Sequence, residues 1–190
     1  MSAKGYAATS VSAICQAAGV AVTSLYWHFG SKEGLLATVM ERGAQRWFDA
    51  LPRWDALSGS AAERTEAILR GGADAVTAHP LFLRLFYLLA LEGGDDGVSA
   101  RLVARVRERA VRFFEDVITG LLAAEHPPDV ARSAAGELAR FAVAYSDGCF
   151  FAAQLEPTHT DLRRMYADLV TVVRALVPEA IARASMCGSR

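Results

Sequence analysis

The chain has 190 residues, of which 53% are hydrophobic and 22% charged, a composition that excludes a disordered protein. Its formal net charge of −1 excludes a uniformly basic protein that coats nucleic acid, although a local basic patch is compatible with it. Residues 1–46 carry four basic and two acidic side chains, a balance of +2, which leaves −3 for the rest of the chain. This asymmetry has the sign expected of an N-terminal nucleic-acid module on a neutral or acidic body.

Alanine and leucine are frequent, and no segment alternates apolar and polar residues between turn signals, so the sequence predicts an all-α fold. Glycines, prolines and capping serines mark the expected helix ends. Gly19 and Gly30 end the first two short helices, and Ser31 is the predicted N-cap of the third. In chain order, the predicted helices cover residues 10–18, 23–29, 32–51, 63–78, 80–91, 99–124, 127–155 and 161–184.

The last two long helices differ from the others because they are apolar nearly all round. From residue 138 to 155, the only clearly polar side chains are Arg140, Ser146, Asp147 and Gln154. A helix of this kind must be covered on more than one side, and a second subunit is the economical cover. The alternative is that this helix is the centre of a single monomeric domain.

The most informative segment is the pair of short helices around Gly19. Val11, Ile14, Val20, Leu25 and Phe29 are expected to form a small core between them. The second helix concentrates hydroxyl, indole and imidazole groups, which suit phosphate oxygens and base edges in a DNA major groove. These groups belong to Thr23, Ser24, Tyr26, Trp27 and His28.

This segment resembles the DNA-binding domain of the TetR family of transcriptional repressors. The matching motifs are Gly-Tyr-x-Ala-Thr-Ser-Val from Gly5, Ala-Ala-Gly-Val ending at Val20, Leu-Tyr-x-His-Phe from Leu25, and Ser-Lys-Glu-x-Leu-Leu ending at Leu36. The resemblance implies a helix-turn-helix domain over residues 1–46 and a helical ligand-binding and dimerisation domain over residues 47–190. It also implies a homodimer, held by the last two long helices, that binds a pseudo-palindromic double-stranded DNA operator.

Roles of individual residues follow from the same resemblance. Thr9 and Ser10 start the first helix of the motif, where a helix cap and a phosphate contact are expected. Tyr26, His28 and Lys32 match positions that grip the DNA backbone. Val22, Thr23, Ser24 and Trp27 match positions that reach the bases. Each side chain also has a structural alternative, since Tyr26 could serve mainly in packing and His28 could be mainly structural.

Two departures from the family pattern limit what can be transferred. The family usually has glycine or proline near Thr23 and often serine at the position of Ala21, so base recognition cannot be copied from a relative. Members also carry a complete helix before the Gly-Tyr-x-Ala segment, whereas only four residues precede Gly5. We expect that the first helix of the domain is missing from this sequence and that a chain beginning at Met1 binds its operator weakly.

The resemblance also predicts an effector site among the aromatic residues of the body. Such stripes are more often core than pocket, but the family places its pocket between the middle helices and the penultimate one. The predicted lining, for a small and mostly apolar or aromatic effector, is Trp47, Phe86, Phe114, Tyr145 and Cys149. Cys149 is more simply a small buried hydrophobe than a redox sensor.

The sequence indicates no cofactor, metal site or catalytic residue. Cys15, Cys149 and Cys187 lie far apart, the histidines lack zinc spacing, and no nucleophile–base pair or phosphate loop is present. An apolar run at residues 81–91 is about half the length that spans a bilayer, so we expect a cytoplasmic protein without membrane contact.

Two other hypotheses therefore compete with the hypothesis of a ligand-responsive repressor. One is an enzyme on a helical scaffold, which the missing chemistry disfavours. The other is a small-molecule-binding or interaction protein with a non-functional DNA module, which a missing first helix would favour.

Overall fold

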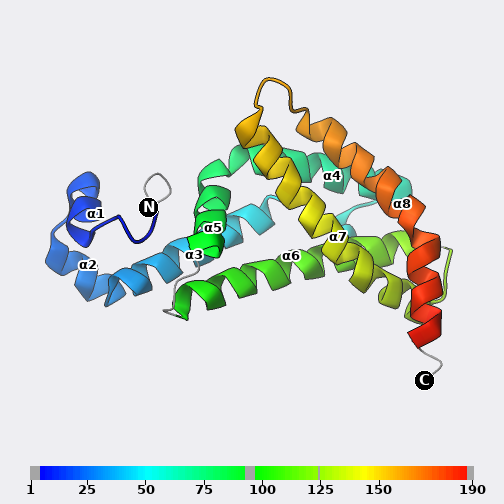
Figure 1. The fold of residues 1–190 in the computed structure, drawn as a ribbon, viewed down its shortest axis with the longest axis horizontal. Helices are drawn as coiled ribbons and strands as arrows, with labels where there is room; N and C mark the ends of the chain where they lie inside the picture. The colour runs from blue at the N-terminus through cyan, green and yellow to red at the C-terminus, as the bar shows by residue number, and fades with distance from the viewer. Residues whose placement is uncertain (1–4, 93–96, 124, 188–190) are drawn as a thin grey trace. The chain divides into compact units, whose positions relative to one another are not determined.

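The computed structural model describes residues 5–92, 97–123 and 125–187, and every regular element among them is helical (Figure 1), which confirms the predicted all-α fold. The elements are α1 (Val11–Ala18), α2 (Val22–Phe29), α3 (Lys32–Asp49), the short 3₁₀ helix η1 (Trp54–Ala56), α4 (Ala61–Ala78), α5 (Pro80–Glu92), α6 (Val98–Leu122), α7 (Pro128–Leu155) and α8 (Leu162–Cys187). Residues 52–62, which lie between two of the predicted helices, contain η1, and α8 continues through Pro178. Within the described residues, no single helix is long and apolar enough to cross a membrane.

Contacts divide the chain into two units, each described by itself. The first comprises residues 1–49 and 79–107, and the second comprises residues 50–78 and 108–190. Helix α6 therefore supplies its N-terminal part to the first unit and its C-terminal part to the second. The division predicted from the sequence, between residues 46 and 47, stays a prediction.

In the first unit, α3 packs against α5 and the start of α6. The buried side chains of this core are Leu36, Met40, Leu85, Phe86, Leu89 and Leu102. Gly43 allows α3 to approach α5 closely, because a Cβ at this position would lie 2.5 Å from Cδ2 of Phe82. The apolar residues that repeat along α3 thus form one buried stripe.

The second unit has the larger core, built mainly on α7. This helix buries nine residues, most of them alanines, against neighbours that include α8 and the second half of α6. Small side chains let helices approach closely, as at Gly72 of α4, where a Cβ would lie 2.9 Å from Cε1 of Tyr166 on α8. Arg163 of α8 also donates a 2.9 Å hydrogen bond to the Asp74 carboxylate of α4.

Candidate nucleic-acid interface

The turn between α1 and α2 is fixed by backbone hydrogen bonds around Gly19. Gly19 has φ 67°, a left-handed conformation that favours glycine. The Val20 amide donates to the Cys15 carbonyl at 3.0 Å, and the Gly19 amide donates to the Gln16 carbonyl at 3.3 Å. This pair of bonds is the Schellman motif, so the predicted end of the first helix is confirmed together with its cause.

Helix α2 exposes almost every side chain that the sequence assigns to DNA. Leu25 is its only buried residue, and the side chain of Trp27 is 82% exposed. The other predicted contact residues of α2 are exposed as well: Val22, Thr23, Ser24, Tyr26 and His28. The His28 ring lies 4.6 Å from the Trp27 ring in an edge-on arrangement, so both rings form one aromatic surface.

The electrostatic surroundings of α2 suit an anionic partner. No acidic residue occurs between residues 5 and 32. Ala21 precedes α2 in an extended conformation and supplies no side-chain cap, so the amides of the first turn lack a side-chain acceptor. Those amides and the positive end of the helix dipole favour a negatively charged group there.

The start of α1 is held by two hydroxyl groups. Ser10 is the N-cap, as predicted, and its Oγ accepts a hydrogen bond from the Ala13 amide at 3.1 Å. Thr9 donates its hydroxyl proton to the Gly5 carbonyl at 2.7 Å. Both hydroxyls therefore stabilise the entry to α1, and their predicted phosphate contacts would add to these bonds.

A cluster of Tyr6, Lys32 and Glu33 ties the segment before α1 to the start of α3. The Lys32 ammonium donates to the Tyr6 carbonyl at 2.7 Å and lies 4.2 Å from the centre of the Tyr6 ring. The Tyr6 hydroxyl donates to Oε1 of Glu33 at 3.0 Å. Lys32, predicted to grip the DNA backbone, thus has an intramolecular partner for one of its three donor protons.

The same cluster lowers the pKa of the Glu33 carboxyl. Its own backbone amide, the Ser31 hydroxyl and the Tyr6 hydroxyl stabilise the carboxylate and lower the pKa of Glu33. Ser31 also caps α3, since its Oγ accepts from the Gly34 amide at 3.1 Å, which confirms the predicted cap. Neither Tyr6 nor Glu33 is among the predicted functional residues, although both lie inside the motifs that match the family.

The small core of the two-helix module differs from the prediction at two positions. Val20 is 49% exposed, because it lies in the turn after Gly19 rather than on the inner face of α1. Cys15 takes the inner position and is 3% exposed. Of the remaining predicted core residues, Leu25 is buried, and Val11, Ile14 and Phe29 are half-buried.

The predicted effector lining is distributed over both units. Trp47 and Phe86 belong to the first unit, and Phe114, Tyr145 and Cys149 belong to the second. The Tyr145 hydroxyl donates to the Met165 carbonyl at 3.0 Å. Nε1 of Trp47 is buried and has no hydrogen-bond partner among the described residues. That these five residues line one effector site stays a prediction.

The two described thiols are inert in this setting. Cys15 and Cys149 are both free and buried. Burial raises the pKa of Cys149 to about 11, so its reactive thiolate is scarce at neutral pH. In the described part of the chain, no three His, Cys, Asp or Glu side chains come together in a way that could hold a metal ion.

Comparisons with known proteins agree with this geometry. Residues 1–39 match the sequence model of bacterial regulatory proteins of the tetR family. No curated protein matches the chain. A solved structure of a proposed transcriptional regulator from Pseudomonas aeruginosa PAO1 superimposes with a TM-score of 0.76 at 21% identity, covering 96% of this chain and 86% of the other. This likeness shows that the two chains share a fold.

Proposed function

Because residues 1–39 match the model of the tetR family of bacterial regulatory proteins, we propose that this chain is a ligand-responsive repressor of that family. It binds a pseudo-palindromic operator as a homodimer, and a mostly apolar small molecule releases it. The observation that carries the proposal is the exposure of the polar and aromatic side chains of α2 within the matched segment. The family match supports regulation of transcription, while repression, release by ligand and the operator are parts of the proposal.

In this proposal α2 is the recognition helix and lies in the major groove. Val22, Thr23, Ser24 and Trp27 face base edges, and Tyr26 and His28 contact phosphates. Thr9, Ser10 and Lys32 hold the DNA backbone on either side. The uncapped amides of the first turn of α2 add a phosphate site, because Ala21 provides no competing side chain.

Exposed faces of α7 and α8 support the homodimer. On α7, Phe141, Ala144, Gly148 and Leu155 recur at intervals of three, four or seven residues and are all exposed, with Leu155 at 78%. The exposed positions of α8 include Ala167, Thr171, Ala175 and Pro178, which are small or apolar. A second copy that offers the same small side chains would pack closely on this face. We expect Ala144→Glu to convert the dimer to a monomer in sedimentation velocity, because it places a charge in the contact.

The buried indole N–H of Trp47 supports an effector near α3. A buried donor without a partner costs about 1–3 kcal/mol, which a ligand acceptor or an ordered water would recover. The effector must bind the DNA-free state more tightly than the DNA-bound state, since equal affinity would shift nothing.

Operator binding by the full chain tests the proposal most directly. Fluorescence anisotropy with a duplex from the region upstream of the chain's own coding sequence should give a strong salt dependence and a loss of affinity for Trp27→Ala and Tyr26→Ala. A matched control is Leu81→Ala on α5, which also removes an exposed large side chain, 68% exposed in the structure. If the Trp27→Ala/Tyr26→Ala double variant binds the duplex like the wild type, the DNA module is non-functional. The chain is then better described as a small-molecule-binding or interaction protein.

A further inference from the structure

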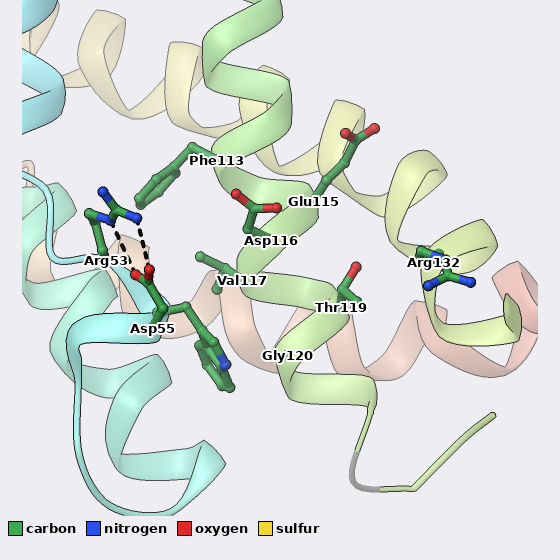
Figure 2. Close-up of a pocket in the computed structure, with 10 residues that line it drawn as sticks. Arg53, Asp55, Phe113, Glu115, Asp116, Val117, Thr119, Gly120 and Arg132 are labelled. Carbon is green, nitrogen blue, oxygen red and sulfur yellow. Dashed lines mark hydrogen bonds and ion pairs between the residues drawn. The ribbon is translucent and has the colours of Figure 1, made fainter. Parts of the chain in front are cut away.

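The second unit contains a cavity that the proposed function does not use. It has a volume of about 760 Å³, which falls in the range of sites for small organic molecules, about 300–1,000 Å³ (Figure 2). Its walls come from Arg53, η1, the C-terminal half of α6 and Arg132 of α7. It shares no residue with the predicted effector lining of Trp47, Phe86, Phe114, Tyr145 and Cys149, so it is a separate candidate site.

The charges around this cavity do not cancel. Arg53 and Asp55 neutralise each other through two hydrogen bonds, of 3.1 Å from Nε and 2.8 Å from Nη2. The remaining charged side chains on its walls are Glu115, Asp116 and Arg132, and none of them has an ion-pair partner within 4.0 Å among the described residues. In Figure 2, Asp116 lies between the Arg53–Asp55 pair and the side chains of Glu115 and Arg132. Among the side chains that line the cavity, two carboxylates against one guanidinium leave one negative charge. Arg64 does not line the cavity, and its Nε donates to the Gly59 carbonyl at 3.1 Å.

Aromatic surface accompanies this negative charge. Phe113 of α6 and Trp54 of η1 both line the cavity. The Trp54 indole occupies the space that a Cβ would take at Gly120, so the missing side chain of Gly120 lets the indole lie against α6. The guanidinium of Arg64 lies 5.7 Å from the centre of the indole, so this ring already interacts with one cation.

We infer that this cavity binds a monovalent organic cation with a flat apolar body. The positive nitrogen lies against the carboxylates of Asp116 and Glu115, and the body packs on Trp54 and Phe113. Arg132 disfavours a second positive charge on the ligand. An anion is disfavoured because Arg53 is already paired with Asp55, and Arg132 alone would oppose two carboxylates.

Three probes that share one aromatic body test the charge preference. They are pyrenylmethyl-trimethylammonium, pyrenemethanol and pyreneacetate, which are positive, neutral and negative at pH 7. Isothermal titration of the full chain should show the cation binding at least about fivefold more tightly than either other probe, the scale of a partly solvated charge pair. Tighter binding of pyreneacetate, or equal affinity for all three, would overturn the inference. So would the absence of binding by the cation.

Charge-removing variants locate the site. Asp116→Asn and Glu115→Gln should each weaken binding of the ammonium probe by roughly threefold to fivefold and leave pyrenemethanol unchanged. Glu156→Gln removes another exposed carboxylate of the same unit and should change nothing. If both cavity variants bind the cation like the wild type, the probe binds elsewhere and the inference fails. These titrations contain no DNA, so their failure leaves the operator proposal standing, and loss of operator binding would leave the cation site standing.

Discussion

The two-helix module α1–α2 and the long helix α7 bury their residues to very different extents. Helices α1 and α2 have eight residues each, and each buries a single side chain, Cys15 and Leu25. Helix α7 has 28 residues and buries nine. The module leaves most of its side chains exposed to a partner, whereas α7 buries one whole face in the core of its unit.

This difference changes what holds each region together. Apolar burial contributes about 25 cal/mol per Å², so α7 is stabilised mainly by packing. The module depends instead on local devices: the Ser10 cap, the left-handed Gly19, and the hydrogen bonds that join Tyr6 to Lys32 and Glu33. A recognition surface built in this way can expose Trp27 without a large core behind it. Loss of one such cap or hydrogen bond should therefore destabilise the module more than loss of an equivalent interaction destabilises a helix with a large core.

The largest effect is expected from a core deletion in α7. Leu138 is 2% exposed and belongs to the main core of the second unit. Leu138→Ala should lower the free energy of unfolding by about 2–5 kcal/mol, because it removes buried methyl groups and leaves a cavity. Urea denaturation at a fixed protein concentration measures this effect. Leu91→Ala, at a side chain that is 77% exposed, is the matched control and should cost less than about 0.5 kcal/mol. Equal costs would contradict the contrast between core and surface.

A leucine-to-alanine substitution in the α1–α2 module should destabilise that module without loosening the rest of the chain. Leu25 is 4% exposed but belongs to neither of the two larger hydrophobic cores, so Leu25→Ala should cost about 2–3 kcal/mol, at the lower end of the usual range. Hydrogen exchange should then show faster exchange of amides in α1 and α2, with α7 and α8 unchanged. Val22→Ala, on the same helix but 39% exposed, provides the control. Loss of protection throughout α7 would mean that both regions unfold together.

The sequence predicted what depends on neighbouring residues and missed what depends on distant ones. Gly19, Gly30, Ser10 and Ser31 act within four residues along the chain, so their turns and caps could be predicted. Tyr6 and Lys32 are 26 residues apart, and nothing in their spacing indicates that a carbonyl meets an ammonium.

The burial of single side chains also depends on contacts that the sequence does not reveal. The motif predicts a small core, but the turn geometry after Gly19 decides that Cys15 faces inward and Val20 does not. Trp54 lies between two predicted helices, and its place against Gly120 could not be predicted, because that contact joins segments far apart in the chain. The DNA-contact positions of α2 are implied by the resemblance to the TetR family, and the structure exposes all of them.

Two helix caps with the same chemistry should differ in their effect. Ser10 caps the eight-residue α1, and Ser31 caps the 18-residue α3, which buries Leu36, Met40, Ala44 and Phe48. Each Ser→Ala change removes a hydrogen bond worth about 1 kcal/mol. Ser10→Ala should open α1 locally, because a helix of two turns has little else to hold it. Ser31→Ala should only fray the first turn of α3. Hydrogen exchange of both helices measures the difference, and equal loss of protection would show that length and burial do not matter here.

The smallest effect is expected from the hydroxyl of Tyr6. Its hydrogen bond to Glu33 is one of the interactions that lower the pKa of this carboxyl, after the backbone amide of Glu33 and the Ser31 hydroxyl. The folded state therefore holds the Glu33 proton less tightly than the unfolded state. The resulting stabilisation is present above the ordinary pKa of 4.5 and is lost as the pH falls through the lowered value.

Tyr6→Phe keeps the ring beneath the Lys32 ammonium and removes the hydrogen bond to Glu33. Carbon-detected NMR titration should show the Glu33 pKa moving upward toward its ordinary value, but only part of the way, since the two larger causes remain. The pKa of Glu63 is lowered by its own partner, Ser60, and should not move, so it serves as an internal control. An unchanged Glu33 pKa would mean that the Tyr6 hydroxyl does not hold the carboxylate in solution. The tie between residue 6 and α3 would then rest on the hydrogen bond from Lys32 and on the packing of the aromatic ring against the core of the first unit.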